Sequence, residues 1–112
     1  MQIDFASSSL DKDCTSDRSR TRTFGVNRAK ALGRRLSALL AASNLEQLRN
    51  TPGHWHELKG DRKGQIAADL DGPYRLILEP VIDDASRAAH AQGLVWSLIA
   101  RVLILEIADY HG

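Results

Sequence analysis

The stretch that decides the fold lies near the end of the chain, where Val102 to Ile107 reads VLILEI. A nearly continuous apolar run rich in branched residues is typical of a central strand that is covered on both faces. Before it, short segments at residues 54–58, 65–70 and 74–79 are separated by the polar stretch 59–64 and the Asp71-Gly72 hairpin signal, which predicts a β-meander. Pro73 and Pro80 frame the third segment, because proline is best tolerated at strand ends.

The first half of the chain has a helical pattern instead. Residues 1–5 predict a short strand, and residues 7–13 indicate a turn or a helix start. Apolar residues then recur at spacings of three and four between residues 17 and 42, with a break expected at Phe24-Gly25. Ser43 and Glu46 have the spacing of a capping box for a short helix over residues 44–49. We therefore predict one α+β domain over residues 1–112, with N-terminal helices on one face of a small, mainly antiparallel twisted sheet and the C-terminal strand central.

Charge is divided unevenly along the chain. Fifteen basic and fourteen acidic side chains give a net charge of +1, but residues 1–64 carry +5 and residues 65–112 carry −4. Seven basic residues and no acidic residue lie between Arg18 and Arg35. This basic helical surface predicts contacts with an anionic partner, with Arg28, Arg34 and Arg35 as candidates, unless the fold interleaves the two halves.

Several classes of protein are not supported. Cys14 is the only cysteine, which excludes an internal disulfide and suits a reducing cytoplasm. The N-terminus lacks the basic region of a signal peptide, and residues 94–108 are shorter than the roughly 20 residues that span a bilayer. Phosphate-cradle, dinucleotide-binding and zinc-protease motifs are absent. We therefore expect a cytoplasmic protein without a cofactor and without a membrane segment.

The remaining polar residues suit metal-free RNA cleavage. That reaction needs a base for the 2′-hydroxyl, cations for the crowded phosphorane and an acid for the leaving 5′-oxygen. Histidine can act as base or acid near neutrality, and Lys and Arg bind phosphate oxygens. His54 and His56 could share a strand face as a metal pair, but no Cys or carboxylate stands at a fixed spacing, so we expect no metal site. Arg75, on the third strand, needs an acceptor, for which Asp69, Glu79 and Asp109 are the choices.

Three segments together resemble the HigB-like host-killing toxins of the RelE/ParE superfamily. They are LEQL (45–48) before a Pro-Gly turn, HELKGDRKG (56–64) with DGPYR (71–75), and IADYH (107–111). The resemblance implies a toxin that cuts translated mRNA in the ribosomal A site without metal and is neutralised by a helix-turn-helix (HigA-like) antitoxin. It assigns catalytic roles to His56, Arg75, Asp109, Tyr110 and His111, and phosphate-binding roles to the loop residues Lys59, Arg62 and Lys63.

The sequence departs from the family pattern in two places. Gln65-Ile66-Ala67-Ala68 stands where an aromatic residue often follows the last glycine of the motif, and the loop before the last strand is long. Two other functions stay open. One is a ParE-like toxin that inhibits DNA gyrase by binding, for which a cluster of His, Tyr, Arg and Lys has no evident use. The other is an inactive relative kept as an antitoxin-binding transcriptional partner. The choice between His56 and His111 as general base is also open.

Overall fold

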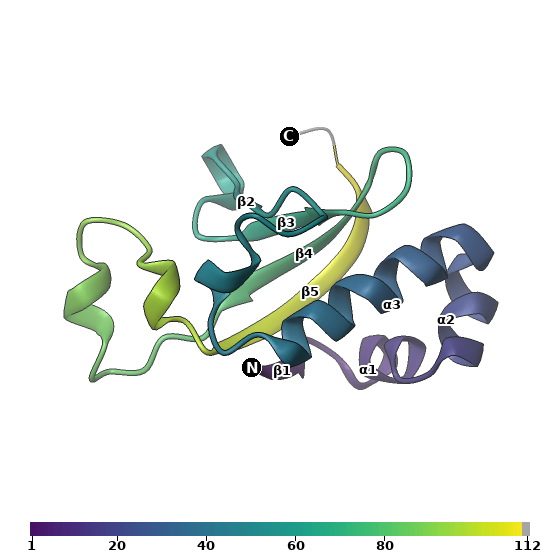
Figure 1. Cartoon of the computed structure of the whole chain (residues 1–112), viewed down its shortest axis with the longest axis horizontal. Helices are drawn as coiled ribbons and strands as arrows, with labels where there is room; N and C mark the ends of the chain where they lie inside the picture. The colour runs from purple at the N-terminus through teal and green to yellow at the C-terminus, as the bar shows by residue number, and fades with distance from the viewer. Residues whose placement is uncertain (111–112) are drawn as a thin grey trace.

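The computed structural model describes residues 1–110, which form a five-stranded mixed sheet with helices on one face (Figure 1). The strand order is β1-β5-β4-β3-β2. β1 (Gln2–Phe5) pairs parallel with β5 (Arg101–Asp109), and antiparallel pairing adds β4 (Tyr74–Pro80), β3 (Ile66–Asp69) and β2 (His56–Glu57). The predicted α+β class and the meander are confirmed, and β5 lies inside the sheet between β1 and β4.

Three helices follow β1, namely α1 (Ser8–Cys14), α2 (Asp17–Phe24) and α3 (Val26–Ala41). Ser7 and Ser16 cap the first two helices by accepting backbone N–H groups, which explains why the serine-rich segment starts a helix. Gly25 has φ +83°, a conformation that glycine adopts without strain, and its N–H donates to the carbonyl of Thr21. The break predicted at Phe24-Gly25 is confirmed.

The main core lies between α3 and the sheet. The helix buries one apolar stripe, including Leu32, Leu36 and Leu39, against Leu76 of β4 and Ile104 of β5. Full burial of such a side chain is worth about 1.5–3 kcal/mol, so this stripe is the principal force that docks the helix. The predicted amphipathic pattern of the helix thus corresponds to its packing.

The face of the sheet opposite the helices, here called the open face, has a smaller cluster. Leu58, Ala67 and Ile77 are buried there, and Leu105, Ala108 and Tyr110 are half-buried against them. The expectation that both faces of β5 are well covered is therefore wrong for the open face. A bulge explains the apolar run in β5: Ile77 faces Glu106 while Leu78 faces Ile104, so the extra residue Leu105 interrupts the alternation.

The short helix after α3 begins one residue later than predicted. It is a 3₁₀ helix, η1 (Leu45–Leu48), whose cap is Asn44 and not Ser43. Asn44 Oδ1 accepts the N–H of Gln47 at 3.3 Å, and Gln47 Oε1 accepts the N–H of Ser43 at 2.7 Å. Gln47 therefore reaches the N–H of the residue before the cap, so the predicted capping box is not formed, and Glu46 forms an ion pair with Arg49 instead.

The long connection between β4 and β5 projects beyond the end of the sheet (Figure 1). It contains two 3₁₀ turns, η3 (Arg87–His90) and η4 (Trp96–Leu98), and the long loop expected before the last strand is confirmed. Trp96 anchors its second half: the indole is buried, donates from Nε1 to Glu57 Oε2 at 2.9 Å and lies under the Arg49 guanidinium. Among residues 1–110 no helix is long and apolar enough to cross a bilayer.

Candidate functional site on the open sheet face

Strand register brings distant polar residues to the open face. Asp69 on β3 faces Arg75 on β4, and His56 on β2 faces Ala67, two residues before Asp69. Since cross-strand partners share a face and side chains alternate along a strand, all three polar side chains share the face of buried Ala67. The pairing of two hairpins therefore assembles a His, an Asp and an Arg that the sequence separates.

Arg75 is held in place by several acceptors. Its Nε lies 2.9 Å from Asp69 Oδ1, and its Nη1 donates to the carbonyls of Gly72 and Tyr74, each at 2.9 Å. Of the three acceptors considered from the sequence, the structure selects Asp69. The side chain is only 20% exposed. Its guanidinium is therefore fixed in direction while one edge remains at the surface.

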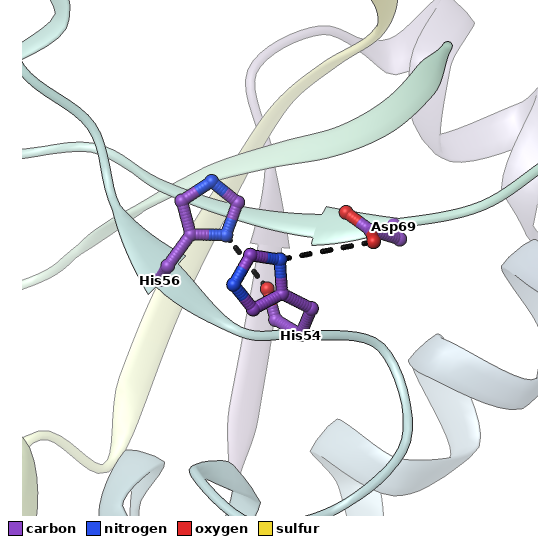
Figure 2. Close-up of side chains that lie close together, drawn as sticks. All are labelled: His54, His56 and Asp69. Carbon is purple, nitrogen blue, oxygen red and sulfur yellow. Dashed lines mark hydrogen bonds and ion pairs between the residues drawn. The ribbon is translucent and has the colours of Figure 1, made fainter. Parts of the chain in front are cut away.

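The two histidines form a stacked pair beside Asp69 (Figure 2). Their ring centroids are 4.4 Å apart with 22° between the planes, and His54 Nδ1 lies 3.8 Å from Asp69 Oδ2. His56 Nδ1 lies 2.7 Å from the backbone carbonyl of His54. A carbonyl can only accept, so Nδ1 of His56 carries the hydrogen and the lone pair of the neutral ring is on Nε2.

A second group of side chains lies on the open face around the turn that follows β2. Arg62, in the 3₁₀ turn η2 (Gly60–Arg62), donates to Gln65 Oε1 at 2.9 Å and to Glu106 Oε2 at 3.4 Å. Its guanidinium carbon is 5.3 Å from the centre of the Tyr110 ring. Lys59 and Lys63 flank this turn and are exposed. The loop predicted to bind phosphate thus presents cations next to the predicted Tyr110.

One described member of the predicted catalytic set is not part of this arrangement. Asp109 is the register partner of Tyr74, whose ring contacts Arg28 on α3, so Asp109 alternates to the face opposite Tyr110. His111 lies outside the described residues. The open face therefore brings together His56, Arg75 and Tyr110 but does not include Asp109.

The predicted basic surface of α3 is largely used within the molecule. Arg28 forms an ion pair with Asp71 at 2.9 Å and stacks 3.3 Å above the Tyr74 ring. Arg35 donates from Nε to the carbonyl of Asp69 at 2.9 Å, and burial lowers the pKa of its guanidinium below the ordinary value, with the nearby Arg34 acting in the same direction. Both arginines therefore tie α3 to the β3–β4 hairpin.

Arg34 differs because it is exposed. It lines a pocket of about 630 Å³ between α2 and α3, together with Arg20 and Lys30. The two charged halves of the chain are interleaved in part, since Arg28 pairs with Asp71 and Arg62 with Glu106. Only part of the basic surface inferred from the sequence thus remains available to a partner.

Sequence reasoning considered His54 and His56 as a metal pair and set the pair aside, treated Asp69 only as one of three acceptors for Arg75, and did not consider Glu106. No local signal connects Asp69 or Glu106 to their partners, because those partners are fixed by register and turn geometry. One nitrogen or oxygen of each of His54, His56 and Asp69 lies within 4.8 Å of the other two, a grouping able to hold a metal ion. No carboxylate stands near the two histidines in the sequence, but in the folded chain Asp69 on β3 supplies one.

Comparisons with known proteins identify the fold. No family model matches the chain, and no curated protein matches it. A solved structure of a YoeB/ParE toxin from Agrobacterium tumefaciens is similar over 99% of this chain and 100% of that chain, with a TM-score of 0.60 and 12% sequence identity. The similarity in three dimensions extends over the entire sheet and its helices, at an identity too low to indicate a function. The chain therefore has the fold of a YoeB/ParE-type toxin.

Proposed function

We propose that this protein is the toxin of a type II toxin-antitoxin system and acts as a ribosome-dependent, metal-independent mRNA endonuclease. The observation that carries the proposal is the convergence of His56, Arg75 and Tyr110 on the open face of a toxin-like fold. The three side chains offer a base, a phosphate-binding cation and an aromatic ring. They line an uncovered sheet surface, which suits an extended polymer better than a small molecule enclosed in a pocket.

His56 is the proposed general base. Its Nδ1–H is engaged by the carbonyl of His54, so Nε2 has the lone pair that removes the 2′-hydroxyl proton. The 2′-oxygen then attacks phosphorus, the O2′–P bond forms and the P–O5′ bond breaks. The products are a 2′,3′-cyclic phosphate and a 5′-hydroxyl, and no oxidant or cofactor is consumed.

Cations stabilise the charge that develops on the phosphorane. Nε and Nη1 of Arg75 are engaged within the protein, and Nη2 donates no hydrogen bond to any of residues 1–110. A guanidinium held in this way offers its remaining N–H groups to phosphate without reorganisation, which is the most effective form of electrostatic catalysis. Lys59 and Lys63 extend the positive potential along the path of the backbone. His111 is the proposed acid that protonates the 5′-oxygen, and Asp109 a residue that orients it.

The partners follow from this function. The ribosome would present mRNA in its A site, which relieves the toxin of binding single-stranded RNA by stacking; aromatic residues are only 5% of the chain. Exposed Arg34 and the pocket it lines would contact ribosomal RNA phosphates. A helix-turn-helix antitoxin of the HigA type would neutralise the toxin in the cytoplasm.

Primer extension on a translated message tests the catalytic assignment. Wild type should cut the message in the presence of ribosomes, whereas His56→Ala, Arg75→Ala and His111→Ala should each reduce cutting by about 100-fold or more, the usual contribution of one acid, base or oxyanion group. His90→Asn is the matched control, because His90 lies on the long connection and Asn retains an acceptor for the N–H of Val95.

Equal cutting in all of these variants would refute the assignment. A purified gyrase assay separates the main competitor: inhibition of supercoiling with messages left intact would show that the toxin acts on gyrase by binding. Absence of growth arrest on induction would indicate an inactive relative that binds only its antitoxin.

A further inference from the structure

We propose that His54, His56 and Asp69 form a binding site for a divalent transition-metal ion of the zinc class. One donor atom of each residue lies within 4.8 Å of the other two. A tetrahedral zinc ion with bonds near 2.0–2.1 Å needs its ligand atoms about 3.4 Å apart. His54 Nδ1 and Asp69 Oδ2 are already 3.8 Å apart, so side-chain rotation alone can close the site.

The backbone holds these donors together before any ion arrives. The N–H of Asp69 donates to the carbonyl of Gly53 at 2.7 Å, which joins the segment that carries His54 to the end of β3. The carbonyl of Asp69 accepts Arg35 Nε from α3 at 2.9 Å. Of the three ligands, His56 is on β2 and Asp69 on β3, and these strands are paired. A site on rigid elements loses little conformational entropy when it binds an ion.

His54 has an unusual backbone conformation. Its φ is +48°, and it is the only residue other than glycine with a positive φ among those the structure describes. A residue of this kind is strained and persists where the surrounding structure or a function requires it. Here the conformation stacks the His54 ring on His56 and directs its Nδ1 toward Asp69 (Figure 2).

The donor set selects the type of ion. Two imidazoles and one carboxylate suit zinc and its neighbours, whereas Mg²⁺ and Ca²⁺ prefer oxygen ligands alone. Three protein ligands leave a fourth tetrahedral position for water. The His54 side chain is 73% exposed, so an ion can reach the site from solvent.

One ion pair and one hydrogen bond shape the site. Arg75 lies against Asp69 Oδ1, which leaves Oδ2 for the ion and orients the carboxylate in the manner of an outer-shell partner. Coordination through His56 Nδ1 would replace its hydrogen bond to the His54 carbonyl. The net contribution of such an exposed hydrogen bond is small beside the free energy of zinc binding.

Occupancy would regulate the proposed RNase. An ion on His56 withdraws the imidazole from proton transfer, so zinc would inhibit a reaction that needs no metal. This consequence rests on the proposed function, whereas binding of the ion does not.

Binding is measured on the full-length, metal-free protein with Co²⁺ as a spectroscopic probe and Zn²⁺ as competitor. Wild type should bind Co²⁺ at one saturable site with visible ligand-field absorption, which Zn²⁺ abolishes. His54→Asn should weaken binding about tenfold or more, because Asn accepts the positive φ but has no imidazole. His56→Gln provides a second loss of ligand if the first variant does not fold.

His90→Asn is the control and should bind the probe as wild type does. No saturable binding by wild type would overturn the proposal, and so would wild-type affinity in a folded His54→Asn or His56→Gln protein. Loss of binding in His90→Asn alone would place the site elsewhere and also overturn it.

Comparing mRNA cutting with and without Zn²⁺ then separates the two proposals. Cutting that Zn²⁺ does not affect would refute inhibition, while a protein that binds Co²⁺ but never cuts mRNA would refute the nuclease and leave the metal site intact.

Discussion

Gly53 is the position where one methyl group should disturb the fold most specifically. Its φ is +120°, a region that L-residues rarely adopt, and a Cβ built there would lie 2.6 Å from Arg35 Nε and 2.9 Å from its Cδ. These atoms belong to the middle of the Arg35 side chain, and Nε donates a hydrogen bond to the backbone carbonyl of Asp69. Gly53→Ala must therefore displace Arg35 from the β3–β4 hairpin.

The expected cost follows from two parts. Backbone strain at such a φ is about 1–3 kcal/mol. Loss of the charged hydrogen bond between Arg35 and Asp69 costs about 1.5–3 kcal/mol, with the lower end appropriate because Arg35 is half-exposed. We expect Gly53→Ala to lower the free energy of unfolding by about 2.5–5 kcal/mol, and to weaken metal binding because His54 is the next residue.

Gly64→Ala is the matched control. Gly64 also has a positive φ, +94°, but no atom lies within 4 Å of its added Cβ, so it should lose only the strain. Urea unfolding followed by the fluorescence of the buried Trp55 and Trp96 measures both variants. In an Arg35→Ala background the excess cost of Gly53→Ala should disappear. Equal losses for the two glycine variants, or an excess that persists without Arg35, would refute the reasoning.

Three further outcomes are expected. Trp96→Phe should cost about 2 kcal/mol in urea unfolding, since it removes part of the buried indole ring together with the N–H that donates to Glu57, whereas Trp96→Ala should cost about 3–5 kcal/mol. Burial raises the pKa of the Cys14 thiol from 9.0 to about 11, so the folded state holds this proton more tightly than the unfolded state. The free energy of unfolding should therefore keep this contribution below pH 9 and fall by about 2 kcal/mol as the pH rises toward 11. The fall should be smaller in Cys14→Ala, which has no thiol to ionise. Arg34→Gln should leave the free energy of unfolding unchanged and reduce by about 1 the slope of log ribosome affinity against log salt concentration, because Arg34 is exposed. Arg28→Gln should instead lower the free energy of unfolding by about 1 kcal/mol, because Arg28 pairs with Asp71. Loss of stability in Arg34→Gln, or a changed salt slope with full stability in Arg28→Gln, would contradict the placement of these two residues.

The structure also shows where local sequence signals mislead. The run from Val102 to Ile107 correctly predicts an inner strand, but its lack of alternation comes partly from the bulge at Leu105 and not from equal cover on both faces. Likewise, Ser43 and Glu46 have capping-box spacing, but Asn44 is the cap because Glu46 pairs with Arg49. In both cases a local feature that residue spacing does not reveal, a bulge in the first and an ion pair in the second, changed the predicted pattern.

Sequence by itself determined the types and order of the elements, the break at Gly25, the single inner strand near the C-terminus and the set of polar residues suited to RNA chemistry. These depend on periodicity and turn chemistry within a few residues. Tertiary structure alone decided that Asp69 holds Arg75 and meets two histidines, and that Arg28 and Arg35 brace a hairpin. Those contacts depend on strand register and helix docking, which bring together residues that no local pattern connects.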